Sequence, residues 1–73
     1  MINRNRVRSE ETWRLRSQYC DSFAIGEHRI KVTQAGKIDD MLDAVKFYDM
    51  EVGPTEMYLL NAEEFCDKFE KIY

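Results

Sequence analysis

The segment from Ile38 to Val52 constrains the fold of this 73-residue chain more than any other. At about 100° per residue, one face of an α-helix would gather its apolar residues: Ile38, Met41, Leu42, Val45, Tyr48 and Val52. Asp39 and Asp40 fall in the first turn, where carboxylates complement the positive helix end. A glycine and a proline follow the stripe, where a helix would end. The pattern predicts a central helix over residues 38–52, packed on strands.

Two large side chains in this segment do not fit the stripe. On a helical wheel Phe47 lies about 180° from Ile38, and Met50 lies about 120° away. Either both side chains cover a flanking segment of a very small domain, or they form an exposed apolar spot that binds a partner. Both interpretations remain open from the sequence, so Phe47 and Met50 are candidate partner-binding residues.

The N-terminal residues predict a basic arm. Residues 1–8 are polar apart from Ile2 and Val7, and they carry three arginines. Such a segment is typical of a chain end without packing of its own. We therefore expect a flexible basic arm over residues 1–8, followed by a single small α+β domain over residues 9–73.

The segment after the arm has two possible structures. Ser9 and the two glutamates after it resemble a helix start. Apolar or aromatic residues then alternate with polar ones from Trp13 to Tyr19, which is the pattern of a strand. The β-favouring residues in this run favour a short strand. In that strand Arg14 and Arg16 would project together toward solvent.

The remaining elements complete a small α+β fold. Short strands are predicted over residues 23–25, 28–33 and 55–60, and the last of these is apolar on both faces, which is typical of a central strand. Asn61 is predicted to cap a final helix of about 11 residues. The expected order is β-β-β-α-β-α, a small antiparallel sheet with two helices packed on it.

The sequence carries no catalytic, cofactor or metal-binding motif. It has a single histidine, His28, no CxxC pair and no glycine-rich phosphate loop. The residues around His28 do not resemble an activated nucleophile or base. The chain also lacks a run of about 20 apolar residues and a signal peptide. We therefore expect a non-enzymatic cytoplasmic protein with reduced thiols, and neither a cofactor nor a membrane association.

Charge is distributed unevenly along the chain. The net charge is −3, divided into +4 for residues 1–37 and −7 for residues 38–73. Such an asymmetry can steer association with a charged partner, or the two halves can neutralise each other within the fold. Basic residues interleaved with Trp13 and Tyr19 could bind single-stranded nucleic acid, but the acidic second half makes this the secondary interpretation.

A protein that binds a larger protein is the favoured interpretation. Arginine and tryptophan are common interface anchors, and charge steers the encounter between partners. The candidate partner-binding residues combine the basic N-terminal stretch with the two off-stripe side chains: Arg4, Arg6, Val7, Arg8, Trp13, Arg14, Arg16, Phe47 and Met50.

In size, in lack of motifs and in charge asymmetry, the whole chain resembles small phage-encoded proteins that seize or block a host machine. The nearest of these are RNA-polymerase-binding inhibitors and antiterminators such as that of a Xanthomonas phage. The resemblance implies stoichiometric binding to host RNA polymerase, blocked promoter engagement and readthrough of terminators. The same character fits an anti-CRISPR protein or an antitoxin-like inhibitor. No functional residues follow from the resemblance.

Overall fold

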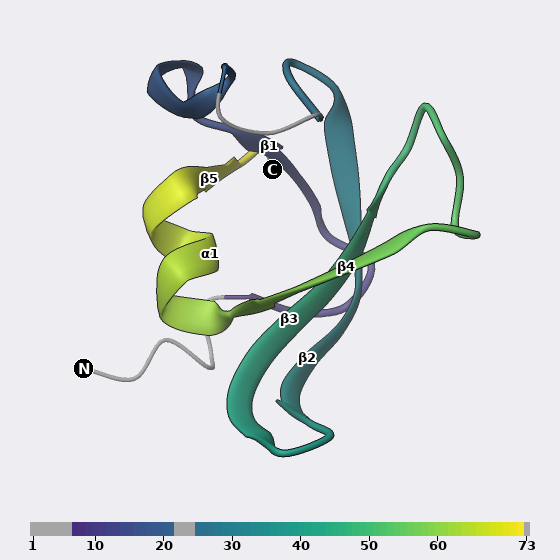
Figure 1. Ribbon diagram of the computed structural model, residues 1–73, viewed down its shortest axis with the longest axis vertical. Coiled ribbons are helices and arrows are strands. Elements are labelled where there is room, and N and C mark those ends of the chain that lie inside the picture. Colours follow the sequence, from purple (N-terminus) through teal and green to yellow (C-terminus); the bar gives the residue numbers. More distant parts are fainter. Residues whose placement is uncertain (1–6, 22–24, 73) are drawn as a thin grey trace.

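One antiparallel sheet of five strands organises the molecule in a computed structural model, which describes residues 7–21 and 25–72. The strand order across the sheet is β4-β3-β2-β1-β5 (Figure 1). A short 3-10 helix, η1, and one α-helix, α1, complete the fold. The bounds are β1 Thr12–Leu15, η1 Ser17–Tyr19, β2 Arg29–Ile38, β3 Met41–Asp49, β4 Met57–Asn61, α1 Ala62–Lys68 and β5 Phe69–Lys71.

The predicted central helix is wrong, because residues 38–52 form the end of β2, a tight turn, all of β3 and the start of the loop that follows it. Ile38 pairs with Met41, so Asp39 and Asp40 form a two-residue turn rather than the first turn of a helix. Asp39 has a φ of 53°, a left-handed conformation that aspartate tolerates better than most residues. The β-favouring residues of β3 then pair on one side with β2 and on the other with β4.

The core lies on one face of this sheet, beneath α1. Phe47, Phe65 and Phe69 are almost completely buried, and the ring centroids of the Phe65–Phe69 pair lie 4.6 Å apart. Trp13 packs 5.0 Å from Phe65 between ring centroids. Aromatic rings at these separations stabilise each other beyond the surface they bury. The ring cluster therefore joins β1, β3, α1 and β5.

The domain includes residues that the sequence assigned to the N-terminal arm. Val7 is buried in the core cluster, and the backbone N–H of Arg8 donates to a carboxylate oxygen of Glu11 at 2.9 Å. These two residues therefore belong to the domain, which corrects the predicted arm at its last positions. The rest of the predicted arm, residues 1–6, lies outside the described part of the chain.

The C-terminal segment contains one short helix followed by a strand. The side chain of Asn61 accepts the backbone N–H of Glu63 at 2.8 Å, so the predicted cap and helix start are confirmed. The helix ends at Lys68, and Phe69 then pairs with Leu15 of β1. Figure 1 shows α1 leading directly into β5 beside β1. Within the described residues the sheet therefore carries one α-helix, rather than the two predicted.

The other predicted strands are confirmed in part. The strand favoured after Ser9 is confirmed over Thr12–Leu15 as β1, but the alternation up to Tyr19 misled the prediction, because Ser17–Tyr19 form the 3-10 helix η1. The strand predicted over residues 28–33 is the first half of β2. Of the strand predicted over residues 23–25, only Ile25 is described, and it lies in a turn. The strand predicted over residues 55–60 is β4, but it lies at an edge of the sheet rather than in the centre. None of the helices in the described chain is long and apolar enough to cross a membrane.

Candidate functional surface

The face of the sheet opposite the core gathers cationic and apolar side chains. Buried residues alternate along β1, the first half of β2 and the second half of β3, so their neighbours in sequence there point to the other side. On β4, Tyr58 and Leu60 pack against the core, which turns Met57 and Leu59 outward. We call this side the outer face, defined by Arg14, Arg29, Lys31, Lys46, Tyr48, Met57 and Leu59.

Two arginines lie directly opposite each other on the outer face. Arg14 of β1 pairs in register with Arg29 of β2, and with Glu70 of β5 on its other side. Like charges opposite each other across strands are destabilising. The Nε atom of Arg14 lies 3.0 Å from a carboxylate oxygen of Glu70, which offsets one of the two charges. Within the described chain, no carboxylate lies within salt-bridge distance of the Arg29 guanidinium.

The two lysines of the outer face also differ in whether a carboxylate neutralises them. The ammonium of Lys31 lies 3.2 Å from a carboxylate oxygen of Glu10, and this hydrogen bond raises the pKa of Lys31 above its ordinary value. No carboxylate of residues 7–21 or 25–72 forms a salt bridge with Lys46. Arg29 and Lys46 are therefore the cations of the outer face that remain available to an anionic partner.

Apolar side chains accompany these cations. Tyr48 lies opposite Met57, and Lys46 lies opposite Leu59. Met57 and Leu59 are 41% and 40% exposed, high fractions for side chains of their size. Exposed apolar side chains that cluster together mark interaction surfaces more often than those that are scattered. The β4 side of the outer face therefore combines an apolar patch with the cation of Lys46.

The loop between β3 and β4 adds two exposed apolar residues at the Arg29 end of the sheet. Met50 is 45% exposed and Val52 is 56% exposed. The backbone N–H of Met50 donates to the carbonyl oxygen of Arg29 at 2.9 Å, which fixes this loop beside the start of β2. Met50 therefore stays a candidate partner-binding residue.

The predicted partner-binding residues fall into three groups. Val7, Trp13 and Phe47 are at most 3% exposed and belong to the core cluster. The expectation that they anchor a partner from the surface is corrected, because their side chains already pack against other core residues. Arg4 and Arg6 are outside the described residues. The remaining candidates lie at exposed or half-buried positions: Arg8, Arg14, Arg16 and Met50.

Arg16 has a structural role at the end of α1. Its Nε and Nη2 atoms donate to the carbonyl oxygens of Asp67 at 3.0 Å and Cys66 at 3.2 Å. Its backbone N–H donates to the carbonyl oxygen of Lys68 at 2.8 Å. Carbonyls in the last turn of a helix lack partners within the helix, and a cation there complements the helix dipole. Arg16 thus fastens β1 to the end of α1.

Sequence reasoning missed most of the outer face. The predicted strand over residues 28–33 turns Ile30 and Val32 inward, and the same alternation places Arg29 and Lys31 on the opposite side. The side chains of β3 could not be placed in this way, because that segment was assigned to a helix. Because β3 is a strand, Lys46 and Tyr48 lie beside the exposed residues of β4.

His28 is held in an ion-pair network at the start of β2. Its Nδ1 atom lies 2.8 Å from a carboxylate oxygen of Asp49, which is 3% exposed. The other carboxylate oxygen of Asp49 accepts the backbone N–H of Glu51 at 2.9 Å. The bond to Asp49 raises the pKa of His28 above its ordinary 6.5, against the opposing effect of desolvation. No described hydroxyl or thiol hydrogen bonds to His28, so the pair does not form a nucleophile triad.

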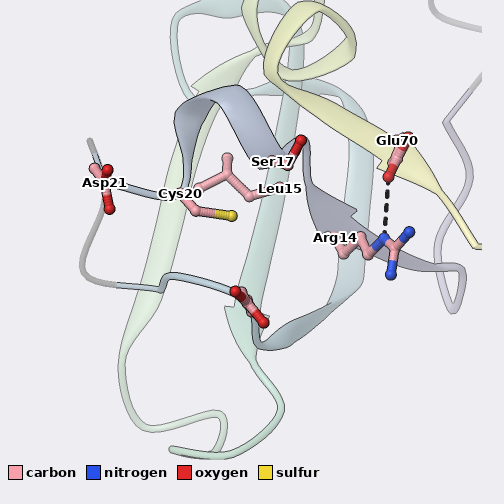
Figure 2. A pocket seen from close by; sticks show the side chains of 7 residues that line it. Arg14, Leu15, Ser17, Cys20, Asp21 and Glu70 are labelled. Atoms are coloured by element: carbon pink, nitrogen blue, oxygen red, sulfur yellow. Dashed lines mark hydrogen bonds and ion pairs between the residues drawn. The ribbon is translucent and has the colours of Figure 1, made fainter.

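A polar hollow of about 490 Å³ lies between β1, η1 and β5. Figure 2 shows Arg14 bonded to Glu70 at one side of it and Cys20 at the other. The Arg14 cation is already paired here, and the thiol of Cys20 donates to the carbonyl oxygen of Arg16 at 3.7 Å. The carboxylates of Asp21 and Glu27 also line the hollow, but no described hydroxyl or thiol hydrogen bonds to either of them.

Metal ligands do not gather anywhere in the described residues, where no group of three or more histidine, cysteine, aspartate or glutamate side chains could hold an ion. Comparison with known proteins found no matching family model, no matching curated protein and no matching solved structure.

Proposed function

We propose that this protein is a non-enzymatic regulator that binds a larger protein stoichiometrically through the outer face of its sheet. The observation that carries the proposal is that one face of the sheet holds both unpaired cations and exposed apolar side chains. Arg29 and Lys46 lack carboxylate partners in the described chain, and Lys46 lies opposite Leu59, beside the exposed Met57. Cations beside apolar residues suit a partner surface that is acidic at its rim and apolar at its centre.

The charge arrangement of the domain supports the same proposal. Ion pairs connect the basic and acidic halves of the sequence where Arg14 meets Glu70 and where Lys71 meets Glu11. The Arg14–Glu70 pair neutralises part of the charge asymmetry within the fold. Arg29 and Lys46 are left as positive positions on a protein whose net charge is −3. A partner would therefore be attracted to this face and repelled by the acidic surface elsewhere.

The finer proposal concerns the partner. By its resemblance in size and character to small phage-encoded host-takeover proteins, the chain would act in the host cytoplasm on RNA polymerase. It would there inhibit initiation and promote readthrough of terminators. Inhibition of another host machine, in the manner of an anti-CRISPR or antitoxin-like protein, would use the same face with a different partner.

Affinity capture from bacterial lysate tests the partner class. Tagged protein is incubated with nuclease-treated and untreated lysate, and bound proteins are identified by mass spectrometry. Recovery of RNA polymerase subunits in both samples would support the finer proposal. It would be followed by promoter-binding and terminator-readthrough assays with purified polymerase. Recovery of a different stoichiometric complex in both samples would replace RNA polymerase but keep the protein-binding function.

Single-stranded nucleic-acid binding is the second candidate, and one observation favours it. Tyr48 lies on the outer face between Lys46 on its own strand and Lys31 opposite it on β2. An aromatic ring between cations can stack on a base while the cations contact phosphates. This candidate predicts binding to oligonucleotides that weakens steeply with salt, with a log–log slope of about −0.7 for each phosphate contacted. A lack of binding to RNA and DNA oligonucleotides at low salt would eliminate it.

A further inference from the structure

The edge strand β4 lacks the features that usually protect an exposed sheet edge. Its residues, Met57–Asn61, pair with β3 on one side, and no backbone hydrogen bond to the other side of β4 is found within the described chain. Natural edge strands are blunted by lysines, prolines, bulges or inward charges. β4 has none of these: it is uncharged, it contains no proline, and its pairing with β3 is regular over all five residues.

We propose that β4 pairs antiparallel with β4 of a second copy, so that two sheets join edge to edge in a two-fold symmetric dimer. This inference goes beyond the proposed function and stands independently of it. The proposed register is centred on Leu59, which lies opposite Leu59 of the second copy. In this register Tyr58 lies opposite Leu60, and Met57 lies opposite Asn61.

The composition of β4 suits pairing with itself. In a two-fold strand pair the central residue meets its own copy, so a charge at that position would create a like-charge contact. The uncharged β4 strand avoids this cost. Outward side chains of Met57 and Leu59 from both copies would form one apolar patch across the junction. Inward side chains of Tyr58 and Leu60 would continue the two cores toward each other.

The same dimer would double the binding surface. The outer faces of both copies lie on the same side of a continuous ten-stranded sheet, because an antiparallel pair keeps its pleat across the junction. The Lys46 cations would then flank the shared apolar patch on both sides. A strand pair of five residues buries less than the roughly 1,200 Å² of a standard interface, so we expect a weak, concentration-dependent dimer.

Charge at the ends of β4 gives the proposal a distinctive signature. Glu56 precedes the strand, and Glu63 and Glu64 follow it in the first turn of α1. In the Leu59-centred register, Glu56 of one copy lies opposite Ala62 of the other, beside these two glutamates. Their repulsion is screened by salt. Association should therefore strengthen as salt is raised and should strengthen in Glu56→Gln.

Sedimentation equilibrium of the purified full chain tests the proposal. We expect a monomer–dimer equilibrium that Leu59→Lys weakens by about 10-fold or more, because the substitution places two lysines opposite each other. The matched control is Leu42→Lys, at a position 81% exposed outside β4, which should leave the equilibrium unchanged. Circular dichroism would confirm that both variants are folded.

Crosslinking gives a second measurement that does not depend on a charged variant. In a Cys20→Ser background, Leu59→Cys should form a covalent dimer with a short bis-maleimide reagent, because residues opposite each other have Cβ atoms about 5 Å apart. Leu42→Cys should not. A wild-type chain that stays monomeric at every concentration tested would overturn the proposal. Equal crosslinking of both cysteine variants, or a dimer that weakens with salt, would overturn it as well.

Discussion

At the scale of single residues, the carboxylate of Glu11 joins three parts of the chain. One of its oxygens accepts the backbone N–H of Arg8 at 2.9 Å and the indole N–H of Trp13 at 3.1 Å. The other lies 2.8 Å from the ammonium of Lys71. Burial raises the pKa of Glu11, but these bonds outweigh that effect and hold the pKa below its ordinary 4.5. The ionised side chain therefore connects the start of the domain, β1 and β5.

Replacement of Glu11 by alanine should lower the free energy of unfolding by about 2 kcal/mol, because hydrogen bonds to a charged, mostly buried group are lost. Urea denaturation near neutral pH measures the change. Glu27→Ala, at an exposed position, is the matched control and should change stability by less than about 0.5 kcal/mol. Because the folded pKa is lowered, the contribution of Glu11 should disappear as the pH falls through that pKa. Equal stability of the two variants would remove Glu11 from this role.

His28 should give a dependence on pH of the opposite sign. Its folded pKa is raised by Asp49, so the stability from this pair is fully present below the unfolded pKa of about 6.5. That stability is lost as the pH rises through the folded value. The midpoint temperatures of thermal unfolding of the wild type and His28→Ala should therefore differ most near about pH 5.5 and least near about pH 9. A difference that grows as the pH rises would contradict the assignment.

Single residues also show where sequence reasoning succeeded and failed. Phe47 did not fit the predicted helix, and the structure explains why: it is 1% exposed on the inward side of a strand. Asp49 obscured the strand pattern, because a carboxylate at an inward position is unusual and its partner, His28, lies 21 residues earlier in the chain. Local sequence could not reveal a pair formed by tertiary contact.

At the scale of elements, short segments were predicted well where local signals were strong. Alternation favoured a strand at β1 and in the first half of β2, a capping pattern marked Asn61, and β4 was recognised as a short run that is apolar on both faces. The hairpin of β2 and β3 was missed because a spacing of three and four residues also arises by chance in a strand with apolar residues on both sides. Ala44 and Val45 are consecutive in sequence and both are fully buried, which hides the two-residue period.

The cap of α1 provides a test at this scale. A helix of seven residues is too short to persist by its own propensity, so its first turn depends on the cap and on packing. Asn61→Ala should lower the free energy of unfolding by about 1 kcal/mol. Asn61→Asp should retain most of the wild-type stability, because the aspartate carboxylate can also accept the backbone N–H of Glu63. Chemical denaturation of both variants measures the effect, and indistinguishable midpoints for alanine and the wild type would contradict it.

At the scale of the whole molecule, the outer face combines residues from four strands that are distant in sequence. Charge counting located the basic half of the chain but could not identify which cations lack a carboxylate partner. Arg14, Lys31 and Lys71 all have carboxylate partners that only the fold brings near. The surface left available therefore differs from the one predicted from the N-terminal arginines, since it is centred on Arg29, Lys46 and β4.

The most direct test of this surface is quantitative capture of partner proteins from nuclease-treated bacterial lysate by three forms of the chain. These are the wild type, Lys46→Glu on the outer face and Lys37→Glu, an identical charge change near the β2–β3 turn. We expect Lys37→Glu to retain the wild-type partner and Lys46→Glu to lose about 90% of it, a tenfold loss of affinity at limiting concentration. Equal recovery by all three forms would contradict the claim that the outer face binds the partner.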